Sequence, residues 1–259
     1  MTAQEIFDRL LAGAVERLCP TCDRRIAGDP NKEVHKIGVC FKLTASLIHL
    51  AMEQGIDLII THEPTFSQSD KREKATALDL KKWALLENSG LTVYRFHDHA
   101  HHRETDYIHQ GFLQALDLNI RHKYPPESIG ICRYRLEEPL TVRQLAERIR
   151  RRLGIEFVRV VGSDDTLVET LGLGLGCVGM EQVQILFDPG CDLFITGEVG
   201  EVCDAEAVRD ACFFGERKAL LILGHYGSEY AGMKLLAQQL AQAYGNAQFL
   251  DGGEVYHSL

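Results

Sequence analysis

The sequence has few of the features that mark membrane or nucleic-acid-binding proteins. Its 28 Lys and Arg residues are outnumbered by 37 Asp and Glu, which gives a formal net charge of −9. This surplus of negative charge disfavours contact with nucleic-acid phosphates, so we expect no direct nucleic-acid partner. The one basic run, residues 148–152, lies in a predicted helix and is interpreted as a solvated face. No apolar run approaches the length of a membrane span, so no membrane partner is expected.

Cysteine pairs and targeting signals are also scarce. The eight cysteines are scattered, and only Cys19 and Cys22 form a CxxC pair. Without a second such pair a zinc site made of cysteines lacks ligands, so we interpret this pair as structural or incidental. Residues 1–18 are amphipathic and contain acids, unlike a secretory signal. These features predict a cytoplasmic protein in a reducing compartment.

What the sequence does contain is an alternation of apolar, strand-like segments with helix-like ones. This rhythm predicts an α/β protein built of parallel βαβ units. Near the N-terminus, strands are expected at residues 36–41, 57–61 and 91–96, and helices at 44–54 and 75–88. Near the C-terminus, strands are expected at 192–196 and 219–223, and helices at 205–213 and 230–244.

The middle of the chain is predicted to form a smaller segment. A helix at 107–118 is followed by the polar, proline-bearing stretch 121–128, which is typical of a boundary. We therefore expect residues 1–122 and 167–259 to form the α/β part that carries the functional site, and residues 123–166 to form a small α/β segment.

Three glycines, Gly172, Gly174 and Gly176, predict a loop between a strand and a helix near Met180. Such a loop can hold a phosphate through backbone amides. This one lacks the Walker lysine and the full dinucleotide spacing, so we interpret it as a tight turn.

Histidines and carboxylates gather where three predicted strands end. His62 and Glu63 follow the run DLIIT, four histidines follow the run LTVYRF, and His225 and Glu229 follow the run ALLILG. Open α/β sheets place their ligand sites at these carboxyl ends. Imidazole and carboxylate groups suit zinc, iron or manganese, and two metals need about five or six such ligands. The sequence therefore predicts a site for two divalent metal ions.

The four histidines between residues 97 and 102 also fit a solvated polar loop, so we expect only one or two of them to be ligands. A strand would point His97, His99 and His101 to one face. If the chain turns there, His97 and His101 can still converge. His99 and His102 are the weakest candidates for metal ligands.

At these residues the sequence resembles the Nif-three-like dinuclear-metal family, also called the GTP cyclohydrolase I type 2 family. Its terminal Gly-His-x-x-Ser-Glu motif is present from Gly224 to Glu229, and its Thr-Gly-Glu element ends at Glu198. The segments TCDRRIAGDP, THEPTF and RFHDHAH are similar to a bacterial subgroup. Two motifs depart from the family pattern: its His-His pair reads His62-Glu63, and its His-x-x-x-Asp loop reads His97 to His101.

The resemblance implies a Nif-three-like fold of two α/β lobes with mixed sheets, which assembles as a toroidal homo-hexamer. It also implies that Glu229 is a bridging carboxylate. It implies that His97 is either a sixth ligand or a residue that contacts a ligand from outside. The ligands it implies are His62, Glu63, His101, His225 and Glu229.

Hydrolysis is the reaction class that a two-metal site favours, because such metals activate water. Glu198 or His99 is then expected to shuttle protons. The cyclohydrolase label implies a nucleotide-like small-molecule substrate whose identity the sequence leaves open. The alternative is a non-catalytic metal-binding protein with a regulatory or interaction role linked to transcription, since the family name comes from such an interaction.

Overall fold

The computed structural model describes residues 1–67, 72–178, 183–187 and 190–257. The chain divides into two compact units, each of which is described by itself. The first unit comprises residues 1–107 and 232–253, and the second comprises residues 108–231 and 254–259. Among the described residues, no helix is both long and apolar enough to cross a membrane.

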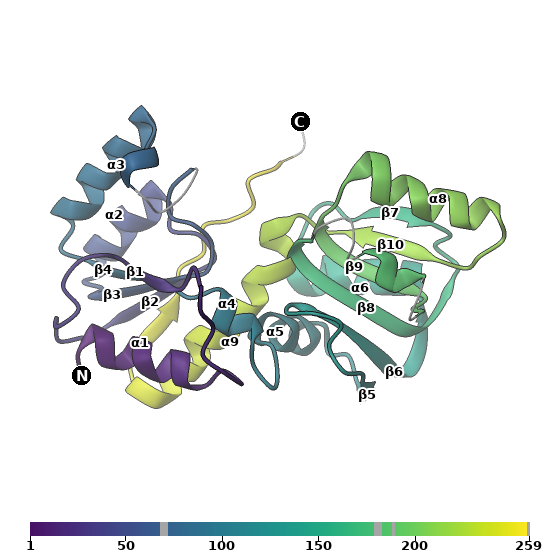
Figure 1. The fold of residues 1–259 in the computed structure, drawn as a ribbon, viewed down its shortest axis with the longest axis horizontal. Helices are drawn as coiled ribbons and strands as arrows, with labels where there is room; N and C mark the ends of the chain where they lie inside the picture. The colour runs from purple at the N-terminus through teal and green to yellow at the C-terminus, as the bar shows by residue number, and fades with distance from the viewer. Residues whose placement is uncertain (68–71, 179–182, 188–189, 258–259) are drawn as a thin grey trace. The chain divides into compact units, whose positions relative to one another are not determined.

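The first unit is built on a five-stranded mixed sheet with the strand order β1-β4-β3-β2-β11 (Figure 1). β1 is antiparallel to β4, and all other neighbours are parallel. The strands are β1 (Arg24–Ala27), β2 (Ile37–Cys40), β3 (Leu58–Thr61), β4 (Thr92–Arg95) and β11 (Ala247–Phe249). The helices include α1 (Ala3–Ala12), α2 (Ala45–Glu53), α3 (Ala77–Asn88) and the short α4 (Asp98–His101), together with one 3₁₀ turn (Arg72–Lys74).

The centre of this sheet is fully buried. Every residue of β2 and β3 is buried, as expected for parallel strands covered on both faces. Figure 1 shows α2 and α3 on one face and α1 on the other. Thr44 and Thr76 cap the N-termini of α2 and α3 through their side chains, which explains where these helices begin.

The second unit is built on a six-stranded mixed sheet with the order β5-β6-β8-β9-β10-β7. β8, β9 and β10 are parallel neighbours, and the outer pairings are antiparallel. The strands are β5 (Ile120–Lys123), β6 (Ile131–Thr141), β7 (Arg159–Gly162), β8 (Leu167–Cys177), β9 (Leu193–Glu198) and β10 (Ala219–Ile222). The helices include α5 (Tyr107–Leu116), α6 (Val142–Leu153) and α8 (Glu206–Phe213), with short turns at Gln184–Leu186 and Glu201–Ala205.

The last helix, α9 (His225–Tyr244), contributes residues to both units, because the division falls between Ala231 and Gly232. The helix was expected to begin at Tyr230 but begins five residues earlier. As a result His225 and Glu229 are one helical turn apart rather than in a loop.

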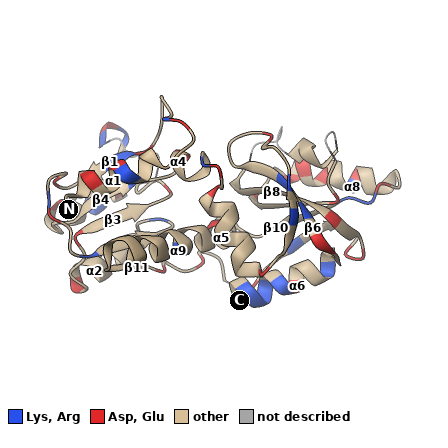
Figure 2. Ribbon diagram, turned by 90° about the horizontal axis from the view of Figure 1, so that it is seen from below, with Lys and Arg blue, Asp and Glu red and all other residues tan. Residues whose placement is uncertain are grey.

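The predicted α/β class with mixed sheets is confirmed. The expected small segment 123–166 contributes β6, α6 and β7 to the sheet of the second unit, because β6 pairs with β8 and β7 pairs with β10. The expected division of the chain at residues 122 and 167 stays a prediction. The basic run lies on α6 (Figure 2), where residues 150–152 are exposed and Arg152 pairs with Asp117 at 3.1 Å.

The predicted glycine loop is wrong, because Gly172, Gly174 and Gly176 all lie within β8. A Cβ atom on Gly174 would stand 2.6 Å from the ring of Phe194, and one on Gly172 would stand 2.8 Å from the same ring. These glycines therefore make room for Phe194 of the neighbouring strand. The helix expected near Met180 falls outside the described residues.

Candidate metal-binding sites

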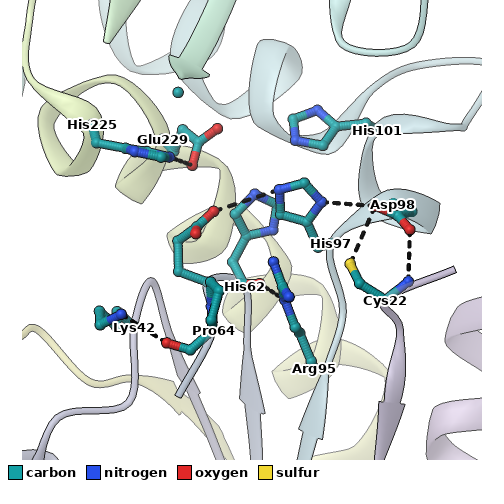
Figure 3. Close-up of polar contacts among 12 residues, drawn as sticks. Cys22, Lys42, His62, Pro64, Arg95, His97, Asp98, His101, His225 and Glu229 are labelled. Carbon is teal, nitrogen blue, oxygen red and sulfur yellow. Dashed lines mark hydrogen bonds and ion pairs between the residues drawn. The ribbon is translucent and has the colours of Figure 1, made fainter. Parts of the chain in front are cut away.

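Three histidine rings converge in the first unit, where β3 and β4 end (Figure 3). His62 follows β3, His97 follows β4, and His101 closes α4. The ring centroids of His62 and His97 lie 4.4 Å apart, and each lies 5.2 Å from that of His101. The turn into α4 is what brings His97 and His101 together. One ligand atom from each ring falls within 4.8 Å of the others.

Hydrogen bonds fix which ring nitrogen can bind a metal. Nδ1 of His62 lies 3.0 Å from the carbonyl oxygen of Phe96, and Nδ1 of His101 lies 2.9 Å from a carboxylate oxygen of Asp106. Neither oxygen can donate, so each Nδ1 carries the proton and each Nε2 carries the lone pair. Such outer partners typically orient histidine ligands in metal sites.

Glu63 and Asp98 lie on opposite sides of His97. Nε2 of His97 is 3.5 Å from Oε1 of Glu63, and Nδ1 is 2.9 Å from Oδ1 of Asp98. Burial by itself would lower the pKa of His97, but hydrogen bonds to Asp98, Cys22 and Glu63 outweigh it and raise this pKa to about 12. The hydrogen bond from His97 in turn holds the pKa of Asp98 far below its usual range. The site thus attracts positive charge strongly.

Asp23, to which the sequence analysis gave no role in the site, holds these ligands in place. Oδ1 of Asp23 accepts the backbone N–H groups of His97 and Asp98 at 2.5 and 3.0 Å. Its other oxygen accepts the N–H of His99 at 2.8 Å. α4 has only four residues and no side-chain cap of its own, so Asp23 acts as its cap from another part of the chain. Asp23 and Asp106 lack any local pattern that points to the site, and the CxxC pattern of Cys22 did not connect it with His97.

His99 is turned away from the three-histidine cluster. Its Nδ1 lies 2.7 Å from Asp23, its Nε2 accepts the N–H of Leu18 at 3.1 Å, and the residue is 1% exposed. These contacts favour a structural role for His99 over the proton-shuttle role that the sequence suggested. His102 lies 3.5 Å from Glu16 at the unit's surface.

A second group of ligand-type residues lies in the second unit, at the start of α9. Nε2 of His225 is 3.3 Å from Oε2 of Glu229, which is 2% exposed (Figure 3). Nδ1 of His225 lies 3.1 Å from Oε1 of Glu198, at the end of β9. His225 is therefore oriented in the same manner as the histidines of the first unit.

The end of β8 is shaped around this pair. A Cβ atom on Gly176, whose φ is +78°, would stand 2.3 Å from Oε1 of Glu229 and 3.1 Å from Nε2 of His225. The backbone N–H of Gly176 donates to Ser228 Oγ at 3.0 Å, and this hydroxyl donates to the carbonyl of His225 at 2.8 Å. Only glycine allows so close an approach in this conformation.

A cavity of about 490 Å³ opens beside His225 in the second unit. Apolar side chains, among them Ile155, Phe157 and Ile222, form part of its wall. Charged groups, among them Arg159 and Glu254, form the rest of the wall. Burial raises the pKa of Glu254. Its size is typical of a small-molecule site.

The donor sets of both units fit a divalent transition metal. Imidazole nitrogens with the tautomer fixed and carboxylate oxygens are the ligands that zinc, iron and manganese take in proteins. Of the residues that the sequence predicted, the structure brings His62, Glu63, His97 and His101 together in the first unit. It brings Glu198, His225 and Glu229 together in the second.

Comparison with known proteins identifies the family. Residues 25–251 match the model of the Duf34/NIF3 (NGG1p interacting factor 3) family. A curated relative, the GTP cyclohydrolase 1 type 2 homolog of Haemophilus influenzae, is 28% identical over 221 residues, which cover 85% of each chain.

Solved structures share the fold. Protein SA1388 of Staphylococcus aureus superposes with a TM-score of 0.78 at 16% identity, over 100% of this chain and 99% of that one. Reduced HcgD from Methanocaldococcus jannaschii gives a TM-score of 0.75 at 17% identity, over 96% of this chain and 97% of that one. With the family match spanning most of its length, this chain belongs to the Duf34/NIF3 (NGG1p interacting factor 3) family.

Proposed function

We propose that the protein binds two divalent metal ions and uses them to hydrolyse a small molecule. The metals are zinc, iron or manganese, which the mixed imidazole and carboxylate donors favour. The ligands proposed are His62, Glu63, His97 and His101 in the first unit, and His225 and Glu229 in the second. One observation carries this proposal: His62, His97, His101 and His225 each have Nδ1 held by an oxygen acceptor.

The residues around the proposed ligands have different roles. When bound, a divalent ion polarises a substrate oxygen and lowers the pKa of water. Glu198 orients His225, and its side chain is 52% exposed, so it can also pass a proton to solvent. Because both ring nitrogens of His99 are engaged by Asp23 and Leu18, Glu198 is the better proton carrier of the two candidates.

The cavity beside His225 is the proposed substrate pocket. Its apolar wall suits a ring, and Arg159 suits an anionic group. The Haemophilus influenzae relative is named a GTP cyclohydrolase 1 type 2 homolog, which makes nucleotide-like compounds the first class to test.

Metal content per chain, measured by elemental analysis, tests the metal proposal. We expect about two metals in wild type and fewer in His101→Ala. The control His49→Ala changes an exposed histidine of α2 in the same unit and should keep the wild-type content. Wild-type protein without metal after expression in metal-rich medium would overturn the proposal.

A hydrolase screen with and without chelator tests the catalytic part. Nucleotides and phosphoesters should be turned over by the metal-loaded protein and not after chelation. Two bound metals without turnover would favour the second candidate, a non-catalytic metal-binding protein with an interaction role linked to transcription. The family description, NGG1p interacting factor 3, is what supports that candidate.

We also propose that the protein is a cytoplasmic homo-hexamer, as the family resemblance implies. All eight cysteines are free thiols, which fits a reducing compartment. Six chains of 29.1 kDa give about 175 kDa, a mass that light scattering distinguishes from that of a monomer or dimer.

A further inference from the structure

The thiol of Cys22 takes part in holding His97. Cys22 Sγ donates to Oδ1 of Asp98 at 3.2 Å, and the same oxygen accepts Nδ1–H of His97 at 2.9 Å. The other oxygen of Asp98 accepts the N–H of Cys22 at 2.9 Å and the hydroxyl of Thr21 at 2.8 Å (Figure 3). Cys22 thus supplies two of the four hydrogen bonds that fix Asp98. A change at Cys22 acts on Asp98 and, through it, on His97.

A second thiol stands close by in the sequence. Cys19 is exposed and Cys22 is partly exposed, and two residues separate them. No other cysteines in the sequence have the CxxC spacing that redox-active pairs use. By contrast, Cys40, Cys132 and Cys191 are buried, and burial raises the pKa of the Cys40 and Cys191 thiols to about 12, which makes them poor nucleophiles.

We propose that Cys19 and Cys22 form a reversible disulfide that weakens metal binding at His97. The oxidant is a peroxide. The inference rests on the proposed metal site, because its effect is read out as metal affinity. It assigns a modification site to the pair that the sequence alone indicated to be structural or incidental.

The reaction balances with one peroxide for each disulfide. The thiolate of one cysteine attacks the O–O bond of hydrogen peroxide, which forms a sulfenic acid and releases hydroxide. The second thiolate attacks that sulfur, which forms the S–S bond and expels the remaining oxygen as hydroxide. The two hydroxides take up the two protons that the thiols lost, so two thiols and one peroxide give one disulfide and two waters.

The consequence for the site follows from the hydrogen bonds. A disulfide sulfur has no proton, so Cys22 can no longer donate to Asp98. Asp98 then holds His97 less firmly. Complete loss of such an outer partner typically weakens metal binding by roughly tenfold to a hundredfold, and the disulfide removes one of the four hydrogen bonds that fix Asp98.

The test uses the full-length protein loaded with zinc. Treatment with hydrogen peroxide should reduce the number of titratable thiols from eight to six, and peptide mapping should find the Cys19–Cys22 link. Zinc affinity, measured by competition with a chromophoric chelator, should fall several-fold, up to roughly tenfold, and a dithiol reductant should restore it.

Two variants make the result specific. Cys19→Ser removes the disulfide partner and leaves every contact of Cys22 in place, so peroxide should not lower its zinc affinity. Cys203→Ser replaces an exposed cysteine of the second unit and should respond as wild type does. Equal loss of zinc from wild type and Cys19→Ser, or a disulfide that leaves affinity unchanged, would overturn the inference. Reduced wild type that binds no zinc would instead contradict the metal proposal itself, and this inference with it.

Discussion

The two units hold their ligand residues in contrasting ways. In the second unit, His225 and Glu229 are four residues apart on one helix, and their geometry is largely local. In the first unit, the ligand segment after β4 is held by Asp23, which is 74 to 76 residues away in the sequence. The comparison teaches that one set of ligands is encoded by a short motif and the other by long-range hydrogen bonds. Substitutions should therefore act differently in the two units.

Glu229→Ala should have the largest effect. The variant removes a buried proposed ligand, which the family resemblance implies is a bridging carboxylate, so bound metal should fall well below the wild-type content. The fold should persist, since alanine is a good helix former. Elemental analysis and circular dichroism measure the two outcomes. Metal content equal to that of wild type would contradict the assignment of Glu229.

Asp106→Ala tests the hydrogen bond that orients His101 in the first unit. The substitution removes the acceptor that fixes the tautomer of His101, and metal affinity should fall roughly tenfold to a hundredfold. Asp106→Asn keeps an oxygen acceptor and should lose less. Competition with a chelator measures the metal affinity of both variants. Equal losses of affinity would contradict a role for this hydrogen bond in orienting His101.

Gly176→Ala tests the packing of β8 against His225 and Glu229 in the second unit, with a matched control. The new Cβ would meet Glu229 at 2.3 Å, so metal affinity should fall together with stability. Gly190→Ala has the same φ of +78° but no neighbour within 4 Å of its Cβ. It should cost about 1 kcal/mol or more of folding free energy from backbone strain alone and leave metal binding unchanged. Similar metal affinities in the two variants would contradict the packing argument.

Asp79→Asn should have the smallest effect and should alter stability without altering metal content. Hydrogen bonds from Ser67 and Thr76 hold the pKa of Asp79 well below its usual range. The stability that this provides is present above the unfolded pKa, about 3.9, and is lost as the pH falls through the lower folded value. The variant should therefore melt at a lower temperature than wild type at pH 7, and the difference should shrink below about pH 4. A constant difference across this range would argue against an ionised Asp79.

The same contrast explains what the sequence could predict. Histidine and glutamate at the ends of predicted strands indicate the candidate ligands His62, His97, His101, His225 and Glu229. Apolar runs and their ends can be recognised in a single sequence. Whether these residues bind metal stays a prediction.

Other features were hidden because they depend on distant partners. Asp23 precedes an edge strand, and nothing near it signals that α4 needs a cap. The glycines of β8 predict a loop because the groups that require them lie on other elements: the ring of Phe194 for Gly172 and Gly174, and Glu229 for Gly176. The start of α9 was missed because Gly224 and Gly227 are weak helix formers.

The single carboxylate of Asp23 has a consequence for how this site can evolve. Three successive backbone amides and the ring of His99 depend on that one group. One codon change at position 23 therefore releases a whole ligand-bearing segment, whereas a change at any one histidine removes a single donor. We expect lineages that lose metal binding to substitute Asp23 early and to accumulate substitutions at the histidines afterwards.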